Sequence, residues 1–164
     1  MSTVPAPAKG AGGLDQASPR AHLPAAARGL VADHAQAHPN WDGIVLLPGN
    51  VPGDPTHWVH LSAGEIISFQ SSLTVRLNTA LAGGTTPDMD ALDATLSRPE
   101  RLASHLASAE LCKDADAILG HLLGAELASA KPYWLGQEIV LLGESPLLPA
   151  YRAALLSQHA LLRS

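Results

Sequence analysis

Apolar residues in the middle of the chain fall into short runs and alternating patterns that are typical of β-strands. Residues 44–47 form a continuous apolar run that ends in a Pro-Gly turn, which favours a strand buried on both faces. Residues 57–61 alternate polar and apolar side chains, and residues 65–69 resume strand composition. A Ser-Ala-Gly reversal at residues 62–64 joins these two runs. The pattern therefore predicts a strand, a loop and a β-hairpin.

The second half of the chain carries mostly helical spacing. Leu73, Leu77 and Leu81 recur every four residues, which predicts a helix over residues 72–81. Residues 86–88 resemble a cap followed by a short helix through residue 96. Further helices are expected over residues 98–112, 114–131 and 145–162, and a buried strand over residues 138–142. We therefore predict an α/β (α+β) fold with a mixed sheet covered by helices. The sheet is expected to contain residues 44–47, 58–61, 65–69 and 139–142, and the helices of Leu119 and Leu155 are expected to cover it.

The first residues have a different composition. Residues 1–27 are rich in Ala, Pro and Gly and offer no periodic apolar face, which predicts a disordered segment. Residues 28–37 are expected to form a short helix that Pro39 stops. The domain organisation predicted from the sequence is thus a tail over residues 1–27 followed by one folded unit over residues 28–164.

Charge and composition exclude several classes of partner. The chain has 164 residues, a formal net charge of -5 and ten Lys plus Arg residues without a basic cluster, so no nucleic-acid partner is expected. No apolar run approaches the ~18 residues of a membrane helix, so no membrane partner and a cytoplasmic location are expected. The single cysteine, Cys112, rules out an internal disulfide and a cysteine-based metal cluster.

Several short motifs follow one another in a recognisable order. They are His38-Pro39-Asn40-Trp41-Asp42-Gly43, Leu47-Pro48-Gly49, Thr56-His57-Trp58-Val59, Ser62-Ala63-Gly64-Glu65, Leu123-Gly124-Ala125-Glu126 and Leu141-Leu142-Gly143-Glu144-Ser145-Pro146. Through these motifs the chain resembles the second half of bacterial 2-dehydro-3-deoxygalactonokinases over residues 28–157. The resemblance implies the C-terminal lobe of a ribonuclease H-like, actin-like kinase. It also implies ATP-dependent phosphorylation of a 2-keto-3-deoxy sugar acid in galactonate catabolism, with ATP and magnesium as cofactors.

The same resemblance implies two groups of site residues. Pro48, Gly49, Thr56 and His57 are expected near the transferred phosphate, where a glycine turn lets backbone amides approach an anion. Gly124, Glu126, Gly143 and Ser145 are expected near the nucleotide, since a helix that starts after Gly143 would offer unpaired amides. Two alternatives stay open. Pro48-Gly49 can be an ordinary strand-ending turn, and Gly124 can serve close packing alone.

The chain also departs from the family pattern. The loop at residues 50–55 is longer, His57 stands where the family has lysine, and apolar residues replace an acidic pair after Arg28-Gly29. The Asp-x-Gly-Thr-like phosphate loop of the family's first half does not occur. No catalytic residue is therefore assigned. We expect the isolated chain to bind ATP at dissociation constants on the order of millimolar or weaker and to phosphorylate no sugar acid.

Its expected partners are a sugar acid, a nucleotide, and either a missing N-terminal lobe or a second copy in a homodimer. A non-catalytic kinase-lobe remnant or a partner-binding module is the alternative function.

The histidines and serines give little support to other chemistries. His34 and His38 are four residues apart on a predicted helix, but no third metal ligand is evident. His57 and His60 would point to opposite faces of a strand. No metal site is predicted. Ser145 lacks the Gly-x-Ser-x-Gly context of a hydrolase nucleophile.

Overall fold

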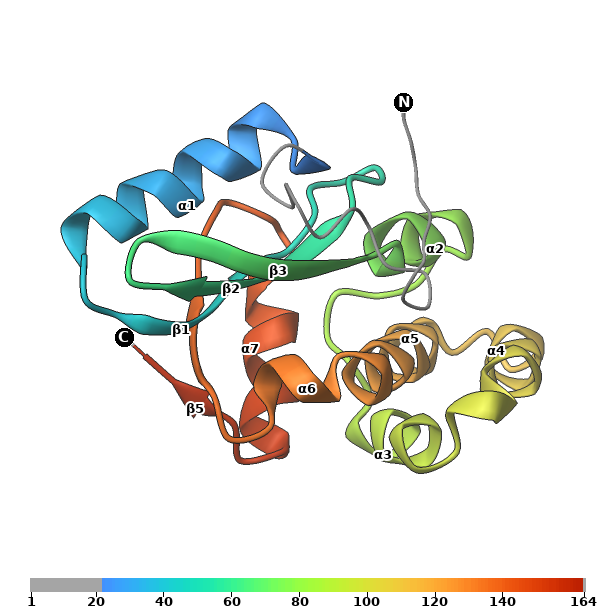
Figure 1. Cartoon of the computed structure of the whole chain (residues 1–164). Helices are drawn as coiled ribbons and strands as arrows, with labels where there is room; N and C mark the ends of the chain where they lie inside the picture. The colour runs from blue at the N-terminus through green and yellow to red at the C-terminus, as the bar shows by residue number, and fades with distance from the viewer. Residues whose placement is uncertain (1–21, 164) are drawn as a thin grey trace.

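A five-stranded mixed sheet lies between helices on both of its faces (Figure 1). The computed structural model describes residues 22–163. The strands are β1 (Asp42–Leu47), β2 (Thr56–Ser62), β3 (Glu65–Ser72), β4 (Glu138–Leu141) and β5 (Leu161–Leu162). The helices are α1 (Ala25–Ala37), α2 (Thr74–Ala80), α3 (Met89–Ser97), α4 (Leu102–Leu111), α5 (Ala115–Ser129), α6 (Lys131–Trp134) and α7 (Leu148–Ser157), with a 3-10 turn at Pro99–Arg101. The predicted α/β class is confirmed.

The sheet has the strand order β3-β2-β1-β4-β5. β2 pairs antiparallel with β1 and β3, whereas β4 lies parallel to β1 and to β5. Val45 of β1 stands opposite Val59 of β2 and Val140 of β4. The four predicted strands are therefore present in one sheet. Because β1 and β4 run in the same direction, their carboxyl ends meet at the same edge of the sheet.

The hairpin between β2 and β3 turns at Ala63 and Gly64, whose φ angles are 50° and 82°. Two consecutive positive φ angles characterise the type I′ turn, whose twist matches that of the flanking strands. The predicted reversal is thus confirmed. A β-bulge between His60 and Leu61 leaves Ile67 of β3 outside the pairing register.

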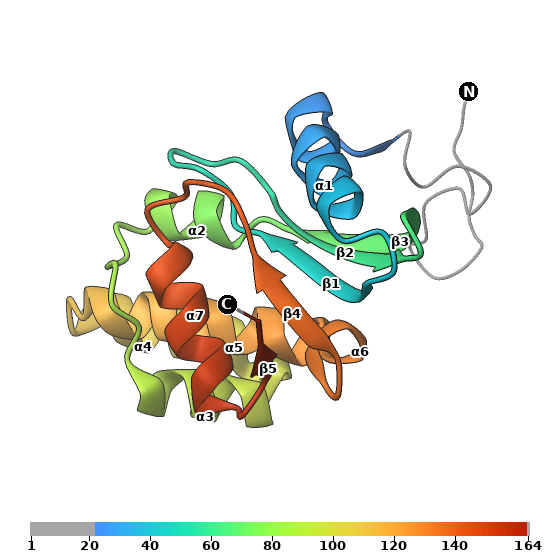
Figure 2. The same ribbon diagram turned by 90° about the vertical axis from the view of Figure 1, so that its left-hand side faces the viewer.

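Helix α1 covers one face of the sheet, as Figure 2 shows. Val31 of α1 and Leu23, just before it, are each 1% exposed and pack with Val45 and Val59 of the sheet. The helix begins at Ala25, earlier than the start expected at residue 28. Residues 1–21 of the predicted disordered segment lie outside the described residues, and its last residues belong to this helix.

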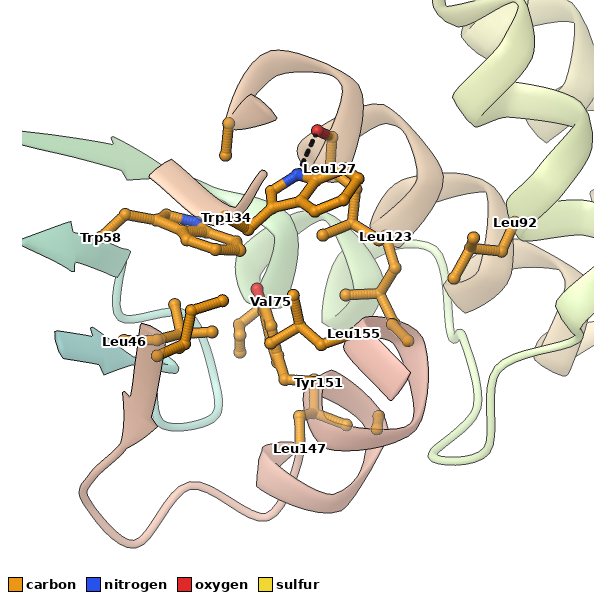
Figure 3. Packing of buried hydrophobic residues seen from close by; sticks show 14 of the residues in the cluster. Leu46, Trp58, Val75, Leu92, Leu123, Leu127, Trp134, Leu147, Tyr151 and Leu155 are labelled. Carbon is orange, nitrogen blue, oxygen red and sulfur yellow. Dashed lines mark hydrogen bonds between the residues drawn. The ribbon is translucent and has the colours of Figure 1, made fainter. Parts of the chain in front are cut away.

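Helices α5 and α7 cover the opposite face around a larger hydrophobic core (Figure 3). Leu119 and Leu123 of α5, Leu155 of α7 and Trp58 of β2 are completely buried there. Full burial of one leucine side chain stabilises the fold by roughly 1.5–3 kcal/mol. The prediction that the helices of Leu119 and Leu155 cover the sheet is confirmed.

Aspartates cap the two helices that pack most closely together, α3 and α5. Asp88 accepts a hydrogen bond from the Ala91 amide, and Asp114 accepts one from the Ala117 amide, each at 3.0 Å. Such caps satisfy amides that have no partner within the helix. The predicted helix starts after residue 88 and at residue 114 are confirmed.

Helix α2 is present as predicted, but its leucine face points outward. Leu73 and Leu77 are each 44% exposed, whereas Val75 and Asn78 are buried. Val75 belongs to the core beneath β2, and the Asn78 side chain donates to the Gly84 carbonyl oxygen at 3.0 Å. This bond satisfies the amide nitrogen of Asn78, whereas its buried Oδ1 atom has no hydrogen-bond partner among the described residues.

The last predicted element, a helix over residues 145–162, is corrected at both ends. Helix α7 spans Leu148–Ser157, and Leu161–Leu162 form β5 beside β4. His159 has a φ angle of 60°, which cannot continue a right-handed helix. The Arg163 amide then donates to the Ile139 carbonyl oxygen at 2.8 Å and extends the parallel pairing.

None of the helices within residues 22–163 combines the length and apolar character that crossing a bilayer requires.

Candidate functional site

A cleft of about 390 Å³ opens at the edge of the sheet where β1 and β4 end. Its walls are the turn after β1, the loop between β1 and β2, the turn after β4, and the first turns of α1. The lining residues are Pro24, Ala26, Ala27, Leu30, Leu47, Pro48, Gly49, Asn50, Asp54, Pro55, His57, Leu142, Gly143 and Glu144. Ligands of α/β proteins commonly bind outside the carboxyl ends of strands. Four of the predicted site residues, Pro48, Gly49, His57 and Gly143, meet here.

Gly49 forms the wall at the end of β1, and both of its backbone groups are committed. Its amide donates to Thr56 Oγ1 at 2.9 Å, and its carbonyl oxygen accepts from Ser145 Oγ at 2.6 Å. A Cβ atom on this residue would overlap the Asp54 carbonyl oxygen. The need for glycine is therefore explained by the loop that folds over it. The amide is not free for an anion while Thr56 holds it.

His57 lines the cleft from the start of β2 and is 7% exposed. Its Nδ1 atom lies 2.6 Å from Ser71 Oγ on the neighbouring strand β3. Burial lowers the pKa of His57 below its usual value, and the nearby Asp54 carboxylate only partly opposes this. The imidazole is thus neutral at pH 7. It supplies no fixed positive charge at the position where the family resemblance implies a lysine.

The charged groups in the cleft wall are acidic. Asp54 and Glu144 line it and are exposed, and no Lys or Arg among residues 22–163 belongs to the lining. Two carboxylates repel a bare phosphate, so these residues fit a free polyphosphate poorly. They do fit magnesium, which proteins often bind through one or two carboxylates together with the phosphates of a substrate. When bound, such an ion would neutralise phosphate charge.

Thr56 and Ser145 lie behind the cleft wall, at 0% and 5% exposure. Ser145 Oγ accepts a hydrogen bond from the Leu147 amide at 3.1 Å in addition to its donation to Gly49. It therefore ties the loop after β4 to the turn after β1. Helix α7 begins at Leu148, so the loop between Gly143 and the helix is longer than the sequence pattern predicts.

Glu126 lies in the core and does not line the cleft. Its carboxylate accepts hydrogen bonds from Trp58 Nε1 at 2.7 Å and from the Tyr151 hydroxyl at 2.6 Å. Burial raises the pKa of Glu126, and the hydrogen bonds to it act in the opposite direction. Burial and the proximity of Glu126 raise the pKa of Tyr151 well above its usual value. Glu126 thus organises buried polar groups of β2, α5 and α7.

Gly124 lies on the side of α5 that contacts α3. A Cβ atom there would overlap the Leu92 carbonyl oxygen. This geometry favours the packing alternative for Gly124. Neither Gly124 nor Glu126 is among the residues that line the cleft, and their nucleotide contacts stay predictions.

Three residues of the cleft wall and of the hydrogen bonds behind it are not identifiable from the sequence pattern. Asp54 and Glu144 stand out there only as parts of a loop and of a motif, and Tyr151 only as an apolar position on a helix. The unusual loop over residues 50–55 is the signal available for Asp54. Tyr151 and Thr56 form a hydrogen bond although they lie 95 residues apart in the sequence. No local sequence pattern indicates this contact.

His34, His38 and His60 do not line the cleft. The rings of His34 and His38 lie 4.6 Å apart between centroids, and His60 Nε2 lies 3.1 Å from an Asp42 carboxylate oxygen. Within residues 22–163, no group of three or more His, Cys, Asp or Glu side chains is arranged to hold a metal ion.

Comparisons with known proteins give two matches. The sequence model of the family described as 2-keto-3-deoxy-galactonokinase matches residues 26–163. A crystal structure of a Sinorhizobium meliloti protein, provisionally described as a 2-dehydro-3-deoxygalactonokinase, superimposes with a TM-score of 0.67 at 24% sequence identity. The match covers 82% of this chain but 52% of the other, so the chain spans about half the length of that protein. A search of curated proteins finds no significant match.

Proposed function

Because the chain belongs to the 2-keto-3-deoxy-galactonokinase family, we propose that it is the nucleotide-side lobe of a sugar-acid kinase. The reaction proposed for the complete enzyme is ATP-dependent phosphorylation of a 2-keto-3-deoxy sugar acid. In this proposal the chain contributes the strand-end cleft, and the sugar-acid site and the first phosphate loop come from a second lobe. That lobe is either a further segment of polypeptide or a partner chain.

One observation carries the proposal. The turns after the parallel strands β1 and β4, which bear Gly49 and Gly143, converge on one cleft. Phosphoryl transfer requires positioning and charge stabilisation more than covalent help from the protein. Rigid turns at adjacent strand ends supply positioning. The family match supports the use of this cleft for a nucleotide.

The charges of the cleft decide what the lobe can do alone. Asp54 and Glu144 favour a magnesium–nucleotide complex over the free nucleotide, and neutral His57 adds no cation. The positive charge that must meet the transferring phosphoryl group is therefore supplied by magnesium and by groups outside this cleft. We propose weak binding of magnesium–ATP by the isolated chain and no phosphorylation of a sugar acid without the second lobe.

A titration of the isolated chain with ATP, with and without magnesium, tests this proposal. Chemical-shift changes in ¹H–¹⁵N spectra are expected at Gly49, Asn50, His57 and Gly143 when magnesium is present. The expected dissociation constant is on the order of millimolar or weaker. Without magnesium, no saturable change is expected at these residues, because the two carboxylates repel the phosphates.

Paired substitutions sharpen the test. Asp54→Asn with Glu144→Gln is expected to remove the magnesium requirement while leaving the fold intact, since both side chains are exposed. Glu65→Gln, an exposed substitution in the β2–β3 hairpin, is the matched control and should leave the titration unchanged. Chemical-shift changes confined to another part of the molecule would contradict the assignment of the cleft.

A further inference from the structure

A continuous chain of buried hydrogen bonds connects the carboxylate of Glu126 with the backbone of Gly49. The Gly49 amide donates to Thr56 Oγ1 at 2.9 Å, and Thr56 Oγ1 lies 2.9 Å from the Tyr151 hydroxyl oxygen. The Tyr151 hydroxyl donates to Glu126 Oε1 at 2.6 Å. A group in the middle of α5 is thereby linked to the wall of the cleft.

The direction of every proton in this chain follows from the carboxylate at its end. Glu126 Oε1 is the acceptor in this bond, so the Tyr151 hydroxyl donates its single proton to it. The bond between Tyr151 and Thr56 must then be donated by Thr56. Because the single hydroxyl proton of Thr56 is used in that bond, Thr56 Oγ1 acts as the acceptor of the hydrogen bond from the Gly49 amide. One acceptor in the core therefore orients two hydroxyl groups and fixes where the Gly49 amide points.

The burial of these groups gives the arrangement its rigidity. Thr56, Tyr151 and Glu126 are 0%, 1% and 4% exposed. A buried carboxylate without hydrogen-bond donors is strongly disfavoured, and here the second oxygen is satisfied by Trp58 Nε1 at 2.7 Å. Both oxygens of the carboxyl group serve as acceptors, one for Tyr151 and one for Trp58, which an apolar side chain of the same volume could not provide.

A second hydrogen bond holds the carbonyl group of Gly49. Ser145 Oγ donates to the Gly49 carbonyl oxygen at 2.6 Å. The turn after β1 is therefore held from β2 through Thr56 and from the loop after β4 through Ser145. Both walls of the cleft share Gly49 as their common anchor.

We propose that Glu126 is a positioning residue, which acts through Tyr151 and Thr56 to hold the Gly49 turn in the conformation that shapes the cleft. This role differs from the direct nucleotide contact expected of Glu126 from the family resemblance. It rests on the proposed function only for the identity of the cleft's ligand. The positioning itself is a property of the unliganded chain.

Amide hydrogen exchange at Gly49 tests the inference without any nucleotide. Tyr151→Phe removes the hydroxyl that links Thr56 to Glu126 and keeps the aromatic ring. The Gly49 amide is expected to exchange about tenfold faster relative to Val59, a factor that corresponds to one hydrogen bond at the upper end of its usual net strength. Val59, in the interior strand β2 between β1 and β3, reports global opening and corrects for any loss of overall stability.

Tyr133→Phe is the matched control. It removes a different tyrosine hydroxyl, one that is partly buried, bonds Ser68 Oγ at 3.0 Å and has no hydrogen bond to Gly49. This control should leave the Gly49 to Val59 ratio unchanged. Thr56→Ser should preserve the ratio and Thr56→Val should raise it, which keeps the test available if Tyr151→Phe folds poorly.

The inference is overturned if Gly49 keeps its relative protection in a folded Tyr151→Phe variant, because Thr56 would then hold the turn without Glu126. Equal acceleration in Tyr133→Phe would overturn it as well. Neither result depends on whether the cleft binds ATP, so this inference and the proposed function fail separately.

Discussion

Gly49 is the residue at which the cleft and the core meet. Its amide and carbonyl groups are held by Thr56 and Ser145, and the Asp54 carbonyl oxygen occupies the space of a Cβ atom. The glycine is thus required by the chain itself, before any ligand is considered. An overlap with backbone atoms cannot be relieved by rotation of a side chain.

Gly49→Ala is expected to lower the free energy of unfolding by about 1–3 kcal/mol, the usual cost of forcing an extra methyl group into a packed site. Urea denaturation followed by circular dichroism measures it. Gly29→Ala is the control, because Gly29 lies inside α1 and a methyl group added there would meet open space. The control should be stabilised by about 0.5–1 kcal/mol. Equal effects at the two positions would contradict this account of Gly49.

A second prediction for a single residue follows from the neutral imidazole of His57. His57→Lys introduces a cation near Asp54 in the cleft wall, and the affinity for magnesium–ATP is expected to rise by roughly tenfold, or about 1.4 kcal/mol. Isothermal titration calorimetry of the two chains measures the difference. His57→Gln, which is also uncharged, should bind like the parent chain. An unchanged affinity in His57→Lys would show that phosphate does not approach this position.

Among the helices, α3, α4 and α5 are joined by one buried hydroxyl. Thr95 Oγ1 lies 2.7 Å from Nδ1 of His105 and 2.8 Å from Nδ1 of His121, and the two rings stack with centroids 4.8 Å apart. A single hydroxyl can donate to only one of two neutral imidazoles while it accepts from the other. Protonation of both rings would place two cations against each other.

This cluster predicts acid sensitivity. Burial, followed by the neighbouring His105, lowers the pKa of His121, and Asp88 and Asp114 partly oppose them. In the unfolded chain the pKa returns to about 6.5. Between the folded value and about 6.5 the unfolded state binds more protons, so stability falls as the pH drops through this window. Burial also lowers the pKa values of His34 and His57, which act in the same direction.

Thermal unfolding between pH 7.5 and pH 5.5 checks the acid sensitivity. The melting temperature is expected to fall with pH, and His121→Gln should make that dependence shallower. His22→Gln, at an exposed position, serves as the control. If the melting temperatures of the parent chain and of His121→Gln depend identically on pH, the histidine cluster is not the cause of the acid sensitivity.

The elements that the sequence predicted correctly carry a local signal. The hairpin has its glycine turn, α3 and α5 have their aspartate caps, and the strands have continuous apolar runs. β5 was missed because two leucines give no period, and its pairing with β4 is formed only after α7 brings them together. The outward leucine face of α2 was likewise unpredictable, because Val75 and Asn78 are buried through partners elsewhere in the fold.

The candidate site was predictable only in part, for the same physical reason. Glycines at strand ends pointed to Gly49 and Gly143, and these residues do share the cleft. The carboxylates of Asp54 and Glu144 and the hydroxyl of Tyr151 reach the site through long-range topology. The family resemblance located Glu126, but its position in the core follows from how α5 packs against β2 and α7.

At the scale of the whole molecule, the folded unit corresponds to about half of the longer chain of its solved relative. The match covers 52% of the S. meliloti chain, and the cleft described here is open and acidic on its exposed side. A kinase surrounds the phosphates with positive charge from several directions at once. We therefore propose that a lobe whose cleft carries two carboxylates and a neutral histidine requires positive charge from a second lobe.

The direct measurement is a coupled assay of ADP release from ATP and magnesium, with 2-dehydro-3-deoxygalactonate as the acceptor. The isolated chain is compared with a catalytically active full-length member of the family. We predict that the full-length enzyme turns over, while the isolated chain releases no more ADP than the blank without enzyme. Turnover by the chain alone that disappears in Gly49→Val would contradict the need for a second lobe and show that this lobe builds a complete active site.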